Sequence, residues 1–106
     1  MSGFILHPEA FTDLDDIWEF IAQDNQDAAD RVREEIYKII GALVPFPQKG
    51  HRRPDLTTRP LRFTTVRDFL IACAPDEKPL LVIAVIHGSR HPRVMAAILR
   101  DREQHI

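Results

Sequence analysis

Two segments in the first half of the chain place apolar residues at helical spacing. From Glu9 onward the apolar residues are Phe11, Leu14, Ile17, Trp18 and Ile21, and this period predicts an amphipathic helix. Aromatic residues at such spacing usually face a core, so Phe11 and Trp18 are expected to be buried. Pro8 suits the first position of this helix, and residues 4–6 before it form a short apolar strand.

A second helical stripe begins at about Asp27, with Asp24 or Asn25 as its cap. Its apolar positions are Ala28, Ala29, Val32, Ile36, Ile39, Ile40 and Leu43. Because so few residues separate the two stripes, we expect the helices to form an antiparallel hairpin. Pro45 and Pro47 end the second helix.

The second half of the chain predicts strands. Residues 61–66 and 69–74 are joined by the tight Arg67-Asp68 connection, and a turn at 75–79 leads to the stretch 80–90. Residues 80–86 are apolar without alternation, which favours a central strand covered on both faces. Strands with such short links pair antiparallel. After Pro92, the apolar residues Val94, Met95, Ile98 and Leu99 have helical spacing and predict a short terminal helix.

These elements predict an α+β fold in the order β-α-α-β-β-β with a short C-terminal helix. A length of 106 residues fits one domain, 1–106, and an apolar fraction of 44% with 28% charged residues is ordinary for a globular protein. The single cysteine, Cys73, excludes an internal disulfide and is expected to be an inert core residue. No export signal or membrane-spanning run is present, so we expect a cytoplasmic protein without membrane contact.

Charge is segregated along the chain. Residues 9–35 sum to −8 and residues 36–106 to +6, although the whole chain has a net charge of only −2. The basic half suggests a surface that meets an anionic partner, either nucleic acid or an acidic peptide segment. The loop at 46–60 is its most basic part.

Other chemistries have weak support. His87 and His91 stand four residues apart, but they straddle a Gly-Ser turn and no cysteine or acid completes a ligand set, so no metal is expected. Ser89 lacks the surroundings of a hydrolase nucleophile, and the scattered glycines form no phosphate-cradling loop. We expect no cofactor.

The arginines are the remaining candidates for binding an anionic partner, because guanidinium groups bind phosphate or carboxylate in a bidentate manner. We expect Arg62 and Arg90 to lie on neighbouring antiparallel strands and to share one cationic patch. The residues expected to bind a target or an antagonist are Arg52, Arg53, Arg62, Arg67, Arg90 and Arg93.

Several short motifs of this sequence together resemble those of the ParE/RelE superfamily of type II toxin-antitoxin toxins. Ala10-x-x-Asp13-Leu14-x-x-Ile17 is similar to the family's hairpin, and Pro47-x-x-Gly50-x-Arg52-Arg53 to its connecting loop. Arg62, residues 69–71 and residues 85–90 are similar to its three sheet strands. The resemblance implies a toxin that is neutralised by a cognate antitoxin, ParD-like or related.

The family's branches imply different targets. ParE-like members inhibit DNA gyrase, whereas RelE-like members cleave messenger RNA in the ribosome with lysines, arginines and a late tyrosine. Here the only tyrosine is Tyr37 in the hairpin, and Cys73 stands near the point where the family usually places a tyrosine. This favours the ParE-like branch, which acts by binding.

The alternative is a RelE-like ribonuclease. Arg62 and Arg90 would then hold the phosphate, and His87 would transfer protons, with His51 or His91 as other candidates. A stand-alone nucleic-acid-binding module has less support, because no stacking aromatic residues interleave the arginines.

Overall fold

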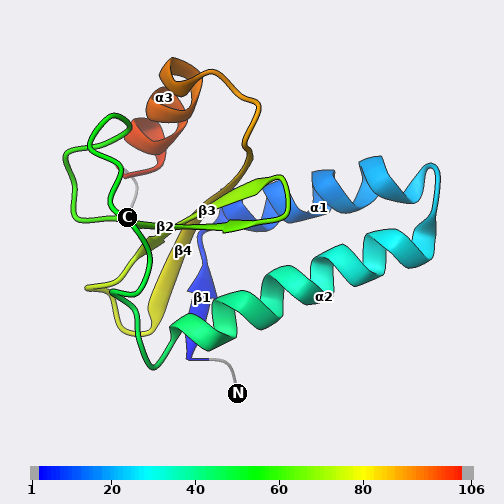
Figure 1. The fold of residues 1–106 in the computed structure, drawn as a ribbon, viewed down its shortest axis with the longest axis horizontal. Helices are drawn as coiled ribbons and strands as arrows, with labels where there is room; N and C mark the ends of the chain where they lie inside the picture. The colour runs from blue at the N-terminus through cyan, green and yellow to red at the C-terminus, as the bar shows by residue number, and fades with distance from the viewer. Residues whose placement is uncertain (1–2, 104–106) are drawn as a thin grey trace.

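A four-stranded sheet forms the middle of the molecule, with a helical hairpin on one face and a third helix on the other (Figure 1). The computed structural model describes residues 3–103. Its elements are β1 Phe4–Leu6, α1 Pro8–Ala22, α2 Gln26–Leu43, β2 Arg62–Val66, β3 Phe69–Ala74, β4 Leu80–His87 and α3 Pro92–Glu103. This order and the α+β class confirm the prediction.

Local capping fixes where the two hairpin helices begin. The Nδ1 atom of His7 accepts the backbone N–H of Glu9 at 3.1 Å, and Pro8 follows as the first helical residue of α1. Asn25 caps α2 by accepting the N–H of Ala28 at 2.9 Å. Of the two caps that the sequence allowed for α2, Asn25 is therefore the one used, and α2 ends two residues before Pro45.

Strand β4 lies between β1 and β3 in the order β1-β4-β3-β2, which confirms its central position. The meander β2-β3-β4 is antiparallel as predicted, whereas β1 pairs with β4 in parallel. Residues 80–86 are all buried. Hydrophobic burial on both faces therefore makes β4 the centre of the fold.

A β-bulge in β4 changes which residues of its continuous apolar run face each of the two hydrophobic cores, one on either side of the sheet. Ala72 pairs with Ala84 and Cys73 pairs with Val82, so Ile83 is the extra residue. Ile83 and Ala84 consequently both face the α3 side, while Val82 and Val85 face the hairpin. The sequence run contains no alternation from which this shift could be read.

The two faces of the sheet pack against different partners. On the hairpin side, Leu14, Ile36 and Ile40 pack with Val82 and Val85. On the other side, Met95 and Leu99 of α3 and Leu56 of the long loop pack with the opposite face. Each fully buried large side chain contributes about 1.5 to 3 kcal/mol of gross burial free energy.

The two aromatic residues assigned to the core from spacing lie elsewhere. Phe11 is 54% exposed, so the prediction that it is buried is wrong. Trp18 is half-buried at the contact of the two helices, where its Nε1–H donates to Asp30 at 2.8 Å and Arg33 lies 5.4 Å above its ring. Helical spacing correctly predicts which face of α1 packs on the sheet. Residues at the margins of that apolar face, such as Phe11 and Trp18, nevertheless lie outside the core.

Cys73 lies in the core on β3, as expected, and is 2% exposed. Burial raises the pKa of its thiol to about 12. Because the thiolate is the reactive form, this cysteine is inert in the folded protein.

Candidate functional site

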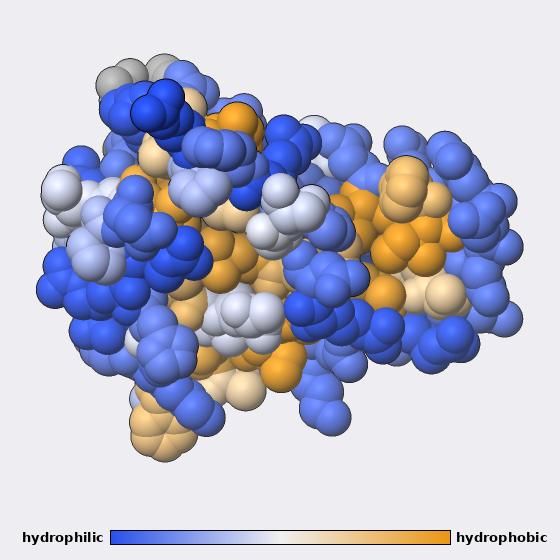
Figure 2. Space-filling view, turned by 45° about the horizontal axis from the view of Figure 1, so that its top comes forward, coloured by the Kyte–Doolittle hydropathy of each residue, from blue (hydrophilic) through white to orange (hydrophobic). Residues whose placement is uncertain are grey.

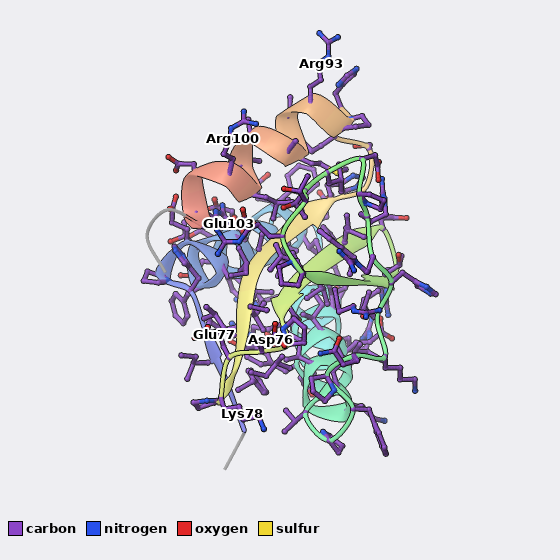
Figure 3. The ribbon with its side chains drawn as sticks, turned by 90° about the vertical axis from the view of Figure 1, so that its left-hand side faces the viewer. Asp76, Glu77, Lys78, Arg93, Arg100 and Glu103 are labelled. Atoms are coloured by element: carbon purple, nitrogen blue, oxygen red, sulfur yellow. The ribbon has the colours of Figure 1, made fainter. Side chains whose placement is uncertain are left out.

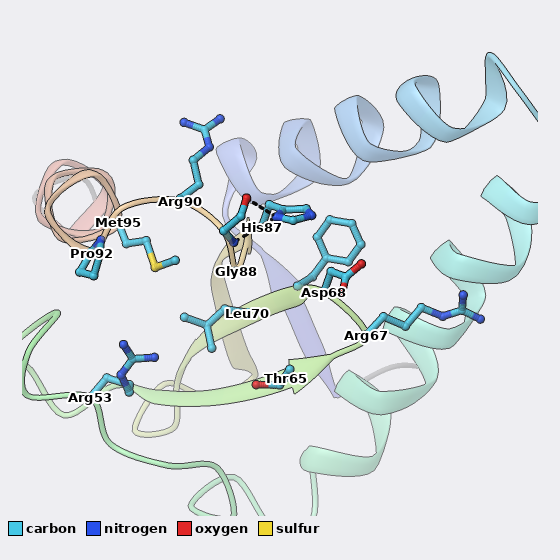
Figure 4. Close-up of a pocket in the computed structure, with 12 residues that line it drawn as sticks. Arg53, Thr65, Arg67, Asp68, Leu70, His87, Gly88, Arg90, Pro92 and Met95 are labelled. Carbon is cyan, nitrogen blue, oxygen red and sulfur yellow. Dashed lines mark hydrogen bonds between the residues drawn. The ribbon is translucent and has the colours of Figure 1, made fainter.

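An open cleft of about 520 Å³ lies at the end of the sheet where β4 finishes (Figure 4). Three segments form its walls: the β2–β3 turn, the loop from β4 to α3, and the long loop before β2. The residues that line it are Arg53, Thr65, Arg67, Asp68, Phe69, Leu70, His87, Gly88, Ser89, Arg90, Pro92 and Met95. The fold therefore brings together residues from positions 53 to 95.

The cleft combines an apolar floor with a charged rim. Leu70 and Met95 are buried at 8% and 4% exposure and belong to the core under α3. Arg53, Arg67 and Arg90 stand at three corners around Leu70 (Figure 4). Figure 2 shows a hydrophobic area in the middle of one face with hydrophilic side chains around it. Such a surface suits a partner that offers both apolar and anionic groups.

The three rim arginines differ in how they are held. Arg53 makes two hydrogen bonds to Asp55, at 3.0 and 2.8 Å, and Arg67 forms an ion pair with Glu35 of α2. The hydrogen bond from Arg53 also holds the pKa of the Asp55 carboxyl below its usual range. Arg90 makes no ion pair with any residue in the range 3–103. Its guanidinium group is therefore the one most available to a partner.

Arg67 also carries an unusual backbone conformation. Its φ of 53° lies in the left-handed region, which costs a side-chain-bearing residue roughly 1–2 kcal/mol. Val66 pairs with Phe69, so Arg67 and Asp68 form a two-residue hairpin connection in which glycine is common. Strain of this kind is often found at functional positions.

The loop that presents Arg90 is fastened by hydrogen bonds on both sides. Gly88 donates its N–H to the Asp68 carbonyl at 2.7 Å, and Arg90 donates its N–H to the His87 carbonyl at 3.1 Å. Ser89 contacts His87 Nδ1 through its backbone N–H at 3.1 Å and its hydroxyl at 2.7 Å. The ring of His87 also meets Phe69 edge-on at 5.4 Å.

The structure contradicts the expected partnership of Arg62 with Arg90. Arg62 begins β2 opposite Cys73, whereas Arg90 follows His87, which pairs with Phe69 at the other end of β3. Those positions on β3 are four residues apart, about 13 Å along the strand. Arg62 instead donates to the Gly50 carbonyl at 3.2 Å, outside the cleft. The prediction is wrong because β2 and β4 run in the same direction, with β3 between them.

Two further candidates stand apart from the cleft. Arg93 projects from the beginning of α3 away from the sheet (Figure 3). Arg52 is exposed on the long loop and does not line the cleft. Of the six arginines expected to bind a partner, the structure thus places Arg53, Arg67 and Arg90 together.

A buried ion pair that sequence reasoning missed holds α3 behind the cleft. Arg102 donates to both carboxylate oxygens of Asp13, at 2.6 and 3.0 Å, and to the Ile83 carbonyl at 3.2 Å. Asp13 in turn accepts the N–H of Val85 at 2.9 Å. Ile83 and Val85 lie past Val82, the last residue of β4 that pairs with the short strand β1. The pair therefore satisfies the sheet edge and joins α1 to α3.

Arg102 stays protonated in this position, because its pKa is raised. Burial acts to lower its pKa, but the hydrogen bond and the charge of Asp13 outweigh that effect and raise it. The sequence holds one signal for this role, since Arg102 continues the apolar stripe of Met95 and Leu99 at helical spacing. A charged residue within an apolar stripe indicates a buried partner.

Residues 3–103 include neither a cluster of metal-ligating side chains nor a helix that could span a membrane. No group of three or more His, Cys, Asp or Glu side chains within residues 3–103 is arranged to hold a metal ion. None of the helices in that range is both long and apolar enough to cross a membrane.

Comparison with known families supplies the assignment. The model of the family described as "ParE toxin of type II toxin-antitoxin system, parDE" matches residues 4–92, from β1 to the first residue of α3. No curated protein matches the chain significantly. The match includes the hairpin, the whole sheet and the loop that presents Arg90. The chain therefore belongs to the ParE toxin family of type II toxin-antitoxin systems.

Proposed function

We propose that this toxin inhibits growth by binding DNA gyrase, and that a cognate antitoxin neutralises it by covering the cleft. The observation that carries the proposal is the composition of the cleft: an apolar floor at Leu70 and Met95 lies beside Arg90, which makes no ion pair within residues 3–103. Such a surface supports recognition of a protein partner. A cytoplasmic location is part of the same proposal.

The same composition argues against RNA cleavage. Cleavage needs a positioned base, a positioned acid and cations around one phosphate. None of the described residues that line the cleft is a lysine or a tyrosine, and Arg62 lies at the opposite end of the sheet. The residues that remain fit binding better than catalysis.

Antitoxin binding follows from the same chemistry. Arg53 and Arg67 are occupied by Asp55 and Glu35 of the chain itself, which shows that the rim accommodates carboxylates. An antitoxin segment with acidic and apolar residues would compete for these groups and cover Leu70 and Met95. Electrostatic attraction of this kind raises the association rate and weakens with salt.

The test measures supercoiling by purified gyrase in the presence of the purified toxin. We expect inhibition by the natural chain and at least a roughly tenfold loss in Arg90→Ala, about the effect of removing one well-placed charged contact. Arg93→Ala is the matched control, because Arg93 is equally charged and close in sequence but projects away from the sheet. Addition of the antitoxin should restore supercoiling.

Full supercoiling at saturating toxin would refute gyrase as the target. Equal loss in Arg90→Ala and Arg93→Ala would refute the cleft as the binding surface while leaving gyrase as the target.

A RelE-like activity is the second candidate, favoured by one contact. His87 and Ser89 form a hydrogen-bonded pair beside Arg90, and an imidazole is a competent proton carrier near neutral pH. Ribosome-dependent cleavage of messenger RNA that disappears in His87→Ala and Arg90→Ala, with gyrase unaffected, would establish this activity instead.

A further inference from the structure

Within residues 3–103, three histidines make the same local hydrogen bond. In His7, His87 and His91 the Nδ1 atom accepts the backbone N–H two residues ahead, at 3.1, 3.1 and 3.0 Å. His7 and His91 thereby cap α1 and α3, and each is followed by proline. His87 and His91 enclose the loop that carries Arg90, and His87 lines the cleft.

This bond requires the uncharged imidazole in one tautomer. A backbone N–H can only donate, so Nδ1 must hold a lone pair and the ring proton must sit on Nε2. Protonation of the ring turns Nδ1 into a donor and removes the bond. The hydroxyl of Ser89 can then reverse its role and accept, but the N–H groups of Ser89 and Arg93 cannot.

The charged groups around His87 act in opposite directions. Asp13 and Asp16 of α1 line a small groove with His87, and Asp68 of the β2–β3 turn lines the cleft with it. These carboxylates attract an imidazolium. The cations that line the same two depressions and repel it are Arg53, Arg67, Arg90 and Arg102.

On protonation, His87 thus loses its acceptor role toward the loop. His91 is exposed, and the charged residues next to it along the chain are Arg90 and Arg93. A charge on its ring would also oppose the positive end of the α3 dipole. Both changes loosen the loop that holds Arg90.

We propose that His87 and His91 form a pH-sensitive latch that fixes the Arg90 loop when both rings are neutral and releases it when they are protonated. The latch is a property of the fold. Its effect on target binding, a loss of inhibition in acid, rests on the proposed function.

The experiment follows backbone amide signals by NMR between about pH 7.5 and about pH 5, the range over which imidazole side chains titrate. In the natural chain, the amide protons of Ser89 and Arg93 should move upfield as the solution is acidified, because each loses its hydrogen bond to the Nδ1 atom of a histidine. Asparagine offers an acceptor at the same position without titrating, so His87→Asn/His91→Asn should abolish both movements. His51→Asn is the control and should keep them.

The two single variants keep the test decisive if the double variant folds poorly. Each should abolish the movement of one amide only, Ser89 in His87→Asn and Arg93 in His91→Asn. Amides that stay still in the natural chain, or that move equally in the asparagine variants, would overturn the latch.

A gyrase assay separates the latch from the proposed function. Each chain is compared with itself, because His87 also lines the cleft. From about pH 7.5 to about pH 6, the natural chain should lose inhibition several-fold, whereas His87→Asn/His91→Asn should keep whatever inhibition it shows at about pH 7.5. Absence of inhibition by both chains at every pH would refute gyrase as the target and leave the NMR result valid. Loss of inhibition in acid to the same extent in both chains, or in neither, with moving amides, would refute the link between latch and binding.

Discussion

Arg102 and Arg90 show how one side-chain type serves two purposes in this toxin. Arg102 is 8% exposed and its guanidinium group is shared between the two oxygens of Asp13 and the Ile83 carbonyl. Arg90 is exposed at the rim of the cleft and makes no ion pair within residues 3–103. Both residues line the small groove that also contains Asp13 and His87.

The difference separates stability from recognition. A buried guanidinium that has lost its partner leaves an uncompensated charge, so Arg102 and Asp13 depend on each other. An exposed arginine keeps its hydration and contributes little to folding, which leaves it free to bind. Substitution of Arg102 should therefore lower the stability of the fold, whereas substitution of Arg90 should weaken binding and leave stability nearly unchanged.

The largest effect is expected from breaking the buried pair. Arg102→Ala or Asp13→Ala should lower the free energy of unfolding by about 3 kcal/mol, since either leaves a buried charge and a sheet-edge group without a partner. Urea unfolding measures this change. Arg100→Ala, on the exposed side of the same helix, should cost less than about 0.5 kcal/mol, and a similar cost at Arg102 would contradict the structural role.

The buried thiol of Cys73 should make the free energy of unfolding fall at alkaline pH. The pKa of Cys73 is raised to about 12 in the folded state, so the unfolded chain releases this proton first and stability falls as pH rises above the ordinary thiol value. Each pH unit in that range costs about 1.4 kcal/mol. Between about pH 9 and about pH 11, the natural chain should lose roughly 3 kcal/mol more than Cys73→Ala. Parallel pH profiles of the two chains would contradict the burial of this thiol.

Arg67 stands between the two extremes, because it combines a rim charge with backbone strain. At its φ of 53°, Arg67→Gly should be more stable than Arg67→Ala by about 1 kcal/mol, since only glycine adopts this region freely. Thermal unfolding of the two variants checks the difference. Equal stability would show that the turn relaxes without strain.

The smallest effect on folding is expected at the cleft rim. Arg90→Ala should change the free energy of unfolding by less than about 0.5 kcal/mol, while growth inhibition in cells that lack the antitoxin is lost. A plating assay with and without antitoxin expression, alongside urea unfolding, measures both quantities. A toxic Arg90→Ala variant of normal stability would assign recognition to another residue.

Local patterns sufficed for much of this fold. Helical spacing on both sides of Asn25, short turns at Arg67-Asp68 and 75–79, and the apolar run 80–86 are local features, and each produced an element of the predicted type. The order of the strands also implies that the start of β2 and the end of β4 lie at opposite ends of the sheet, because alternate strands of a meander run in the same direction. Strand direction alone is therefore enough to separate Arg62, at the start of β2, from Arg90, beyond the end of β4.

Contacts between distant residues were decided by the tertiary structure. The bulge at Ile83 has no signature in a run that is apolar throughout, and Arg102 meets Asp13 across 89 positions of sequence. Likewise, only packing shows that Arg53, Arg67 and Arg90 surround one apolar floor while Phe11 is left in solvent. The sequence by itself determined which elements form, because propensity, capping and turn chemistry act over a few residues. Which charges are buried, paired or free was decided by how those elements pack, because desolvation depends on every neighbour in space.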